Sequence, residues 1–81
     1  MRIAVCDDEK EIREMLAEKI ARLYPDAGLM LYQSGQELLL SDAHPDILFL
    51  DIRMAGKDGM ETARELRKRN RSTIIIFVTA L

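Results

Sequence analysis

The sequence has no tryptophan and only one cysteine, Cys6, among its 81 residues. A single thiol excludes a disulfide within the chain and a metal site built from several cysteines. No apolar run approaches the ~20 residues that a membrane helix needs, so we expect no contact with a membrane. The N-terminal stretch becomes acidic at Asp7 and Asp8, too early for a secretory signal peptide. Together these absences favour a cytoplasmic protein.

Neither sign of charge is in large excess, because the net charge is only -2. This value gives no indication of a polyanionic partner. Hydrophobic residues make up 48% of the chain and charged residues 32%, a balance typical of a globular chain. The length fits at most one domain.

Short apolar stretches alternate with stretches in which apolar residues recur at helical spacing. The predicted strands are residues 2–6, 28–32, 46–50 and 73–80. The predicted helices lie between them, within residues 7–24, 34–40 and 59–70. This β-α-β-α-β-α-β order predicts an α/β fold, an open parallel sheet with flanking helices joined by right-handed crossovers.

Each predicted helix begins with the spacing of a capping box, in which a capping side chain is followed three residues later by glutamate. The three pairs are Asp8 with Glu11, Ser34 with Glu37, and Asp58 with Glu61. We therefore expect the first residue of each pair to accept a hydrogen bond from the first turn of its helix.

Acidic residues also stand where the predicted strands end. Asp7 and Asp8 follow the first strand, Asp51 follows the third, and Thr79 lies at the end of the fourth. The C-terminal ends of parallel strands meet at one edge of a sheet, where open α/β sheets bind their ligands. If the first strand lies between the second and the third, the three aspartates line one crevice.

Three carboxylates this close repel one another, and a pair ~4 Å apart costs roughly 4 kcal/mol at an effective dielectric constant of about 20. A proton or a cation must relieve this repulsion. Oxygen ligands alone suit Mg²⁺, which keeps several waters and often bridges to a phosphate. An aspartate beside Mg²⁺ is a plausible phosphoryl acceptor, because a carboxylate can attack phosphorus to give an acyl phosphate. Thr79 could then donate a hydrogen bond to a phosphoryl oxygen.

Simpler interpretations of the same residues exist. Asp7, Asp8 and Asp51 could be solvated strand ends, with Asp8 serving as a helix cap. Their position at matched strand ends, together with Thr79, favours a metal and phosphoryl site. Cys6 is interpreted as a small core residue, because neighbouring negative charge disfavours a reactive thiolate.

Three separated stretches resemble the receiver domain of two-component response regulators, the CheY-like family. They are AVCDDE (residues 4–9), ILFLDIRMAGKDGMETARELR (47–67) and IIIFVTAL (74–81). The resemblance covers essentially the whole chain. It implies a flavodoxin-like sheet with the strand order 2-1-3-4, the order known for a chemotaxis receiver. The opening residues 1–16 further resemble receivers that precede LytTR-type DNA-binding domains.

The resemblance implies a role for each residue at the acidic edge. Asp51 would be the phosphoacceptor, and its donor would be a phosphohistidine on a sensor histidine kinase. Asp8 and Asp51 would bind Mg²⁺ directly, together with the backbone carbonyl of Arg53. Asp7 would act through water, and Thr79 would be the switch hydroxyl that moves toward the phosphoryl group. The protein would be a phosphorylation switch rather than a turnover enzyme.

The sequence departs from the family pattern in two places. Residue 55 is alanine where receivers commonly have proline, which is expected to loosen the surrounding loop. Receivers also continue beyond the switch hydroxyl through a helix, a strand and a helix. We therefore expect residues 1–81 to be an incomplete receiver domain with impaired signalling, in which DNA binding would need an output domain absent from this chain.

Two other functions compete with this interpretation. One is a Mg²⁺-dependent phosphohydrolase with an aspartate nucleophile, although that class usually has an acid two residues after the nucleophile, where this chain has Arg53. The other is an association module that never takes phosphate. This alternative is suggested by the fourth strand, which would be an uncovered apolar edge. Such an edge would let the chain self-associate by edge pairing or by exchange of elements between chains.

Overall fold

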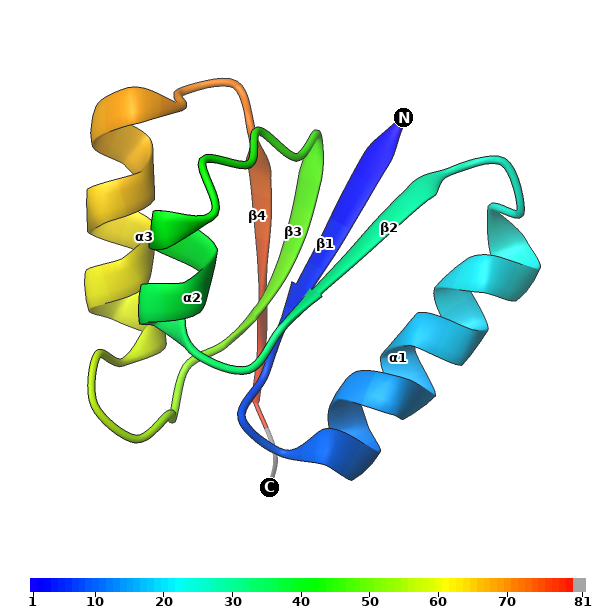
Figure 1. Ribbon diagram of the computed structural model, residues 1–81, viewed down its shortest axis with the longest axis horizontal. Coiled ribbons are helices and arrows are strands. Elements are labelled where there is room, and N and C mark those ends of the chain that lie inside the picture. Colours follow the sequence, from blue (N-terminus) through cyan, green and yellow to red (C-terminus); the bar gives the residue numbers. More distant parts are fainter. Residues whose placement is uncertain (80–81) are drawn as a thin grey trace.

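The computed structural model describes residues 1–79, and the chain alternates strands and helices throughout (Figure 1). The strands are β1 (Arg2–Cys6), β2 (Gly28–Tyr32), β3 (Ile47–Asp51) and β4 (Ile74–Val78). The helices are α1 (Lys10–Leu23), α2 (Gly35–Leu40) and α3 (Gly59–Arg69). The predicted order of elements is confirmed, and Ala80, the last residue of the predicted fourth strand, lies outside the described residues.

The four strands form one parallel sheet in the order β2-β1-β3-β4. This order confirms the flavodoxin-like α/β fold that the resemblance implied. Strands β1 and β3 are neighbours at the centre of the sheet, with Cys6 paired to Leu50 at their C-terminal ends. Asp7 therefore follows β1 beside Asp51, the last residue of β3.

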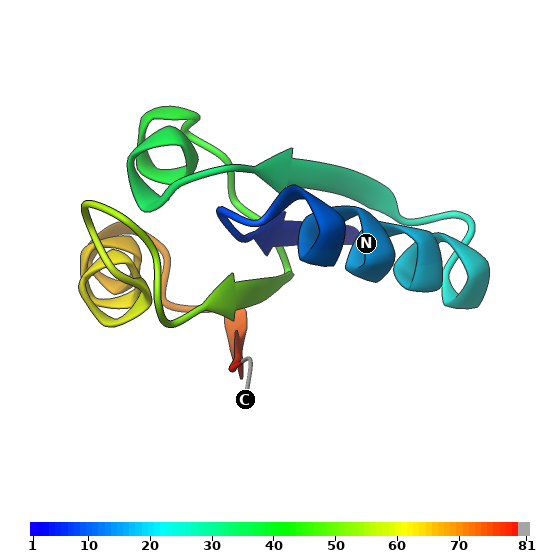
Figure 2. The same ribbon diagram turned by 90° about the horizontal axis from the view of Figure 1, so that it is seen from below.

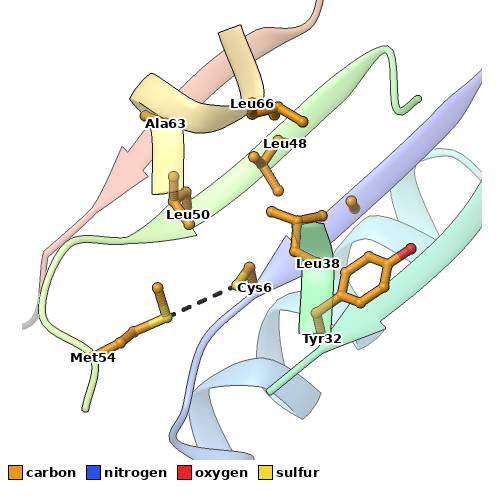
Figure 3. Packing of buried hydrophobic residues seen from close by; sticks show 9 residues of the cluster. Cys6, Tyr32, Leu38, Leu48, Leu50, Met54, Ala63 and Leu66 are labelled. Atoms are coloured by element: carbon orange, nitrogen blue, oxygen red, sulfur yellow. Dashed lines mark hydrogen bonds between the residues drawn. The ribbon is translucent and has the colours of Figure 1, made fainter. Parts of the chain in front are cut away.

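Helices α2 and α3 cover one face of the sheet, and α1 lies on the other (Figure 1). Under α2 and α3, Leu48 and Leu50 of β3 are fully buried against Leu38 and Leu66 (Figure 3). Burial of one such leucine side chain contributes about 1.5–3 kcal/mol. This face holds the larger apolar core and fixes β3 beneath α3.

The face covered by α1 is only partly buried. Ile3 and Val5 of β1 pack against Ile20 of α1. Figure 2 shows α1 beside β1 and β2, away from β4 at the far edge of the sheet. Within residues 1–79, no helix covers β4 on this face, and Ile74 and Ile76 are 58% and 41% exposed. The expected apolar edge at the fourth strand is confirmed.

Two of the three predicted helix caps are confirmed. The Ser34 hydroxyl accepts a hydrogen bond from the Glu37 N–H at 3.0 Å, and the Asp58 carboxylate accepts one from the Glu61 N–H at 2.9 Å. The cap predicted at Asp8 is wrong. Helix α1 begins one residue later than a cap at Asp8 requires, so Glu9 is its N-cap and makes no side-chain cap hydrogen bond. The Asp8 carboxylate is directed instead to the loop after β3.

Candidate metal site at the C-terminal edge of the sheet

Asp7, Asp8 and Asp51 come together at the C-terminal edge of the sheet. One carboxylate oxygen of each residue lies within 4.8 Å of the other two. Asp7 and Asp51 are buried, with 3% and 9% of their surface exposed, whereas Asp8 is exposed. Parallel pairing of β1 with β3 causes this convergence, because it places both strand ends at the same height.

The charged form of Asp51 is disfavoured at this position. Burial raises the pKa of its carboxyl group above the ordinary value, and the charges of Asp7 and Asp8 raise that pKa further. A hydrogen bond from the Arg53 N–H to Asp51 Oδ1, at 3.2 Å, opposes this rise because it favours the charged form. The site therefore favours a proton or a cation at Asp51.

Asp7 is held by backbone and side-chain contacts that the sequence did not reveal. Its Oδ1 accepts a hydrogen bond from the Glu9 N–H at 2.9 Å, and its own N–H donates to the Tyr32 carbonyl at 3.1 Å. The Arg13 guanidinium of α1 donates to the Asp7 carbonyl at 2.8 Å. Arg13 stands among several charged residues of α1, and no sequence pattern distinguishes it from the solvated ones.

Asp8 makes a long-range contact instead of capping α1. Its Oδ2 accepts a hydrogen bond from the Ala55 N–H at 3.1 Å, across 47 positions of the sequence. Ala55 lies in the β3–α3 loop, residues 52–58. The contact uses a backbone donor, so side-chain identity at position 55 could not have indicated it, beyond the fact that the residue is not proline.

Cys6 lies beneath this loop in the apolar core. Its Sγ is 3.8 Å from the Sδ of Met54, and both side chains are buried (Figure 3). Burial, with a smaller contribution from the charge of Asp7, raises the pKa of the thiol to about 12. Cys6 is therefore a core residue, as predicted, and its contact with Met54 anchors the start of the loop.

A groove of about 860 Å³ opens beside the acidic cluster. Asp7, Asp51, Arg53 and Thr79 line it together with apolar side chains of α1. The structure thus brings Thr79 to the same edge as the aspartates, as the sequence predicted. Asp51 thus lines a groove whose walls also include α1 and the end of β4.

The donor set of the cluster fits Mg²⁺. Three carboxylates supply only oxygen ligands, which a hard cation such as Mg²⁺ prefers. The raised pKa of Asp51 adds a second reason, because a cation would relieve the same repulsion that a proton relieves.

Comparison with known proteins identifies the family of this chain. A family model described as the response regulator receiver domain matches residues 3–81. The chain belongs to the response regulator receiver family. Members of this family act as phosphorylation-switch domains rather than as conventional turnover enzymes. The three stretches that carried the resemblance therefore identified the family correctly.

Relatives and solved structures agree with this assignment. The positive alginate biosynthesis regulatory protein of Pseudomonas aeruginosa is 39% identical over 85 residues, covering 99% of this chain and 34% of the relative. An uncharacterised response regulatory protein of Vibrio cholerae is 35% identical over 79 residues, covering 94% of this chain and 30% of the relative. The chain thus spans about a third of the length of these curated relatives.

Among solved structures, the response regulator TrrA of Thermotoga maritima, in complex with Mg²⁺ and beryllium fluoride, is 36% identical with a TM-score of 0.86. The match covers 99% of this chain and 70% of that one. No helix in the described part of this receiver chain is both long and apolar enough to span a membrane.

Proposed function

We propose that this chain is a phosphoacceptor module of a two-component response regulator, with Asp51 as the residue that receives the phosphoryl group. The observation that carries the proposal is the meeting of Asp7, Asp8 and Asp51 at the open end of β1 and β3. Membership of the receiver family supports a sensor histidine kinase as the donor.

The proposed transfer is a displacement at phosphorus. A carboxylate oxygen of Asp51 attacks the phosphorus of a phosphohistidine, a P–O bond forms, and the P–N bond breaks. The electron pair of the P–N bond returns to the imidazole ring of the donor. The groove beside Asp51 supports this proposal, because a donor would approach Asp51 through it.

Mg²⁺ is the cofactor that the cluster suits. Asp8 and Asp51 would bind it directly, with the Arg53 carbonyl, and Asp7 would act through water. The hydrogen bond between the Arg53 N–H and Asp51 supports this set, because it keeps the Arg53 backbone at the cluster. When bound, the ion would offset both the repulsion among the carboxylates and the charge of the phosphoryl oxygens. The Mg²⁺ and beryllium fluoride bound by the relative TrrA support the same chemistry here.

Thr79 is the proposed switch residue. It lines the groove that also contains Asp51, which supports a role for its hydroxyl beside a phosphoryl group on Asp51. Donation of a hydrogen bond from Thr79 to a phosphoryl oxygen would draw the end of β4 toward Asp51. Phosphorylation of Asp51 would thereby change the position of β4, the edge strand of the sheet.

The wider context of the chain is also a proposal. We propose that residues 1–81 are part of a receiver domain, because the match covers 70% of the TrrA chain. DNA binding would belong to an output domain elsewhere in a longer protein, a proposal that the regulatory relatives support. The phosphohydrolase alternative is not favoured, since Arg53 occupies the position at which that class usually has its general acid.

Labelling with a small acyl phosphate tests the proposed function. In the presence of Mg²⁺ and acetyl phosphate, intact mass measurement should show the gain of one phosphoryl group. Asp51→Asn should remove this gain, whereas Asp58→Asn should retain it. Asp58→Asn is a matched control, because asparagine caps a helix as well as aspartate does and Asp58 lies in the loop that follows Asp51. Equal labelling of Asp51→Asn would refute the assignment, and steady release of phosphate from simple esters would favour the hydrolase.

A further inference from the structure

The acidic cluster contains one contact that the proposed function does not use. Among residues 1–79, the Ala55 N–H is the one hydrogen-bond donor to the Asp8 carboxylate, at 3.1 Å. We propose that Ala55 is a positioning residue, whose N–H orients Asp8 for the metal and couples metal binding to the β3–α3 loop. The inference rests on the proposed metal site, and it adds a residue and a mechanism of coupling to that site.

Asp8 needs such a donor more than the other two aspartates do. Asp7 and Asp51 are buried, and each accepts a hydrogen bond from the backbone N–H two residues further along the chain. Asp8 is exposed, so its side chain would otherwise sample several rotamers and lose that freedom when the metal binds. The contact with Ala55 restricts the side chain in advance.

The hydrogen bond leaves Asp8 able to bind a cation. An ionised carboxylate has two oxygens and about four acceptor positions, so one N–H occupies only part of its capacity. One oxygen of Asp8 lies within 4.8 Å of oxygens from Asp7 and Asp51 while Oδ2 accepts from Ala55. Hydrogen bonds of this kind orient the carboxylates that bind metals, and their removal typically weakens metal binding about 10–100-fold.

The loop delivers the Ala55 N–H from a fixed position. Met54 is buried with its Sδ 3.8 Å from Cys6 Sγ, directly before Ala55 (Figure 3). At the far end of the loop, the Gly59 N–H donates to the Ile52 carbonyl at 2.8 Å. The loop that carries the donor is therefore anchored on both sides of Ala55.

The same loop contains the Arg53 carbonyl, a proposed metal ligand. The Ala55 N–H and the Arg53 carbonyl are separated by a single residue, Met54, so a change in the position of one is transmitted to the other. Asp8 at the end of β1 and the loop after β3 thus act as one unit toward the metal. The donor exists because residue 55 is not proline, which would have no N–H.

Mg²⁺ affinity of two variants tests the proposal. Ala55→Pro removes the donor, and Ala55→Ser keeps it while changing the side chain. In a titration followed by backbone amide NMR shifts, Ala55→Pro should bind Mg²⁺ about tenfold more weakly than the parent chain. Ala55→Ser should bind Mg²⁺ as the parent does. Stiffening of the loop by proline would act in the opposite direction, because a more rigid loop loses less entropy when the metal binds.

Hydrogen exchange provides a second readout, and this readout does not depend on whether Ala55→Pro folds. Without metal, the Ala55 amide should exchange about tenfold more slowly in the parent chain than in Asp8→Ala. Mg²⁺ should slow this exchange further in the parent chain, because the coupling between metal and loop is reciprocal.

The outcomes separate this inference from the proposed function. If Ala55→Pro binds Mg²⁺ as well as or better than the parent chain, or if the Ala55 amide exchanges freely, the positioning role is refuted and the metal site stands. If the parent chain binds no Mg²⁺, the proposed function itself fails, and the coupling to metal fails with it. Loss of labelling in Asp51→Asn, together with slower exchange of the Ala55 amide in the parent chain than in Asp8→Ala, would support both proposals.

Discussion

Replacement of Gly59 by alanine should separate α3 from the strand that carries Asp51. Gly59 is the first residue of α3 and is buried against the end of β3. A Cβ at this position would lie 2.7 Å from the Cα of Ile52 and 2.9 Å from the carbonyl carbon of Asp51, and it would clash with the Asp51 carbonyl oxygen. The atoms in its way belong to the backbone, so no side-chain rotation can relieve the contact.

The size of the effect follows from these distances. Carbon atoms pack best about 3.5–4.0 Å apart, so the helix and the strand must move apart by about 1 Å. Overpacking of this kind costs about 1–3 kcal/mol. The movement also weakens the hydrogen bond from the Gly59 N–H to the Ile52 carbonyl, worth about 0.5–1.5 kcal/mol. The better helix propensity of alanine offsets up to about 1 kcal/mol, so a net loss of roughly 2 kcal/mol is expected.

Thermal unfolding followed by circular dichroism measures this loss. For a domain of this size, about 2 kcal/mol corresponds to a fall in Tm of about 8–16 °C. Gly28→Ala is the matched control, because a Cβ there would lie 3.7 Å from the Arg2 Cγ, an ordinary contact. Its free energy of unfolding should stay within about 0.5 kcal/mol of the parent value. Equal Tm values for the two variants would refute the close approach of α3 to Asp51.

Two further predictions concern charge and association. Because the pKa of Asp51 is raised in the folded state, the folded state holds more protons than the unfolded one, and stability falls as pH rises from the unfolded value through the folded pKa. In metal-free urea unfolding, Asp51→Asn should therefore gain stability relative to the parent as pH increases from about 4 to 7; a pH-independent difference would contradict the raised pKa. The exposed edge of β4 should make the chain self-associate, and Ile76→Lys should reduce the mass measured by light scattering. A monomeric parent at tens of micromolar would exclude this association.

The fold was predictable because its determinants are local or periodic. Apolar runs such as residues 47–50 fix the strands, and the hydroxyl of Ser34 and carboxylate of Asp58 mark helix starts that the structure confirms. Strand order came from the family resemblance rather than from periodicity, because alternation of strands and helices does not specify which strands are neighbours. The uncovered edge at β4 follows once that order is known.

The site was predictable only where side chains mark it. Aspartates at strand ends are visible in the sequence, and parallel pairing brings them together. The helix cap predicted at Asp8 was wrong because the partner of this side chain is distant in the sequence. Its capping-box spacing to Glu11 is a local signal, whereas its actual partner is a backbone N–H 47 positions away. The contact between Arg13 and the Asp7 carbonyl was missed for the same reason, since a backbone acceptor leaves no trace in the residue types.

Each of the three aspartates accepts one hydrogen bond from a backbone N–H, and the three differ in what they connect. The donors to Asp7 and Asp51 come from within their own loops, at 2.9 and 3.2 Å, so each bond stabilises a single turn. The donor to Asp8 comes from another loop, so among these three bonds it is the one that joins the end of β1 to the segment after β3. Repulsion among the carboxylates pushes these two segments apart, and the hydrogen bond from Ala55 opposes it. A cation at the cluster would remove the repulsion and leave the bond, so metal binding should tighten both loops together, before any phosphoryl group arrives.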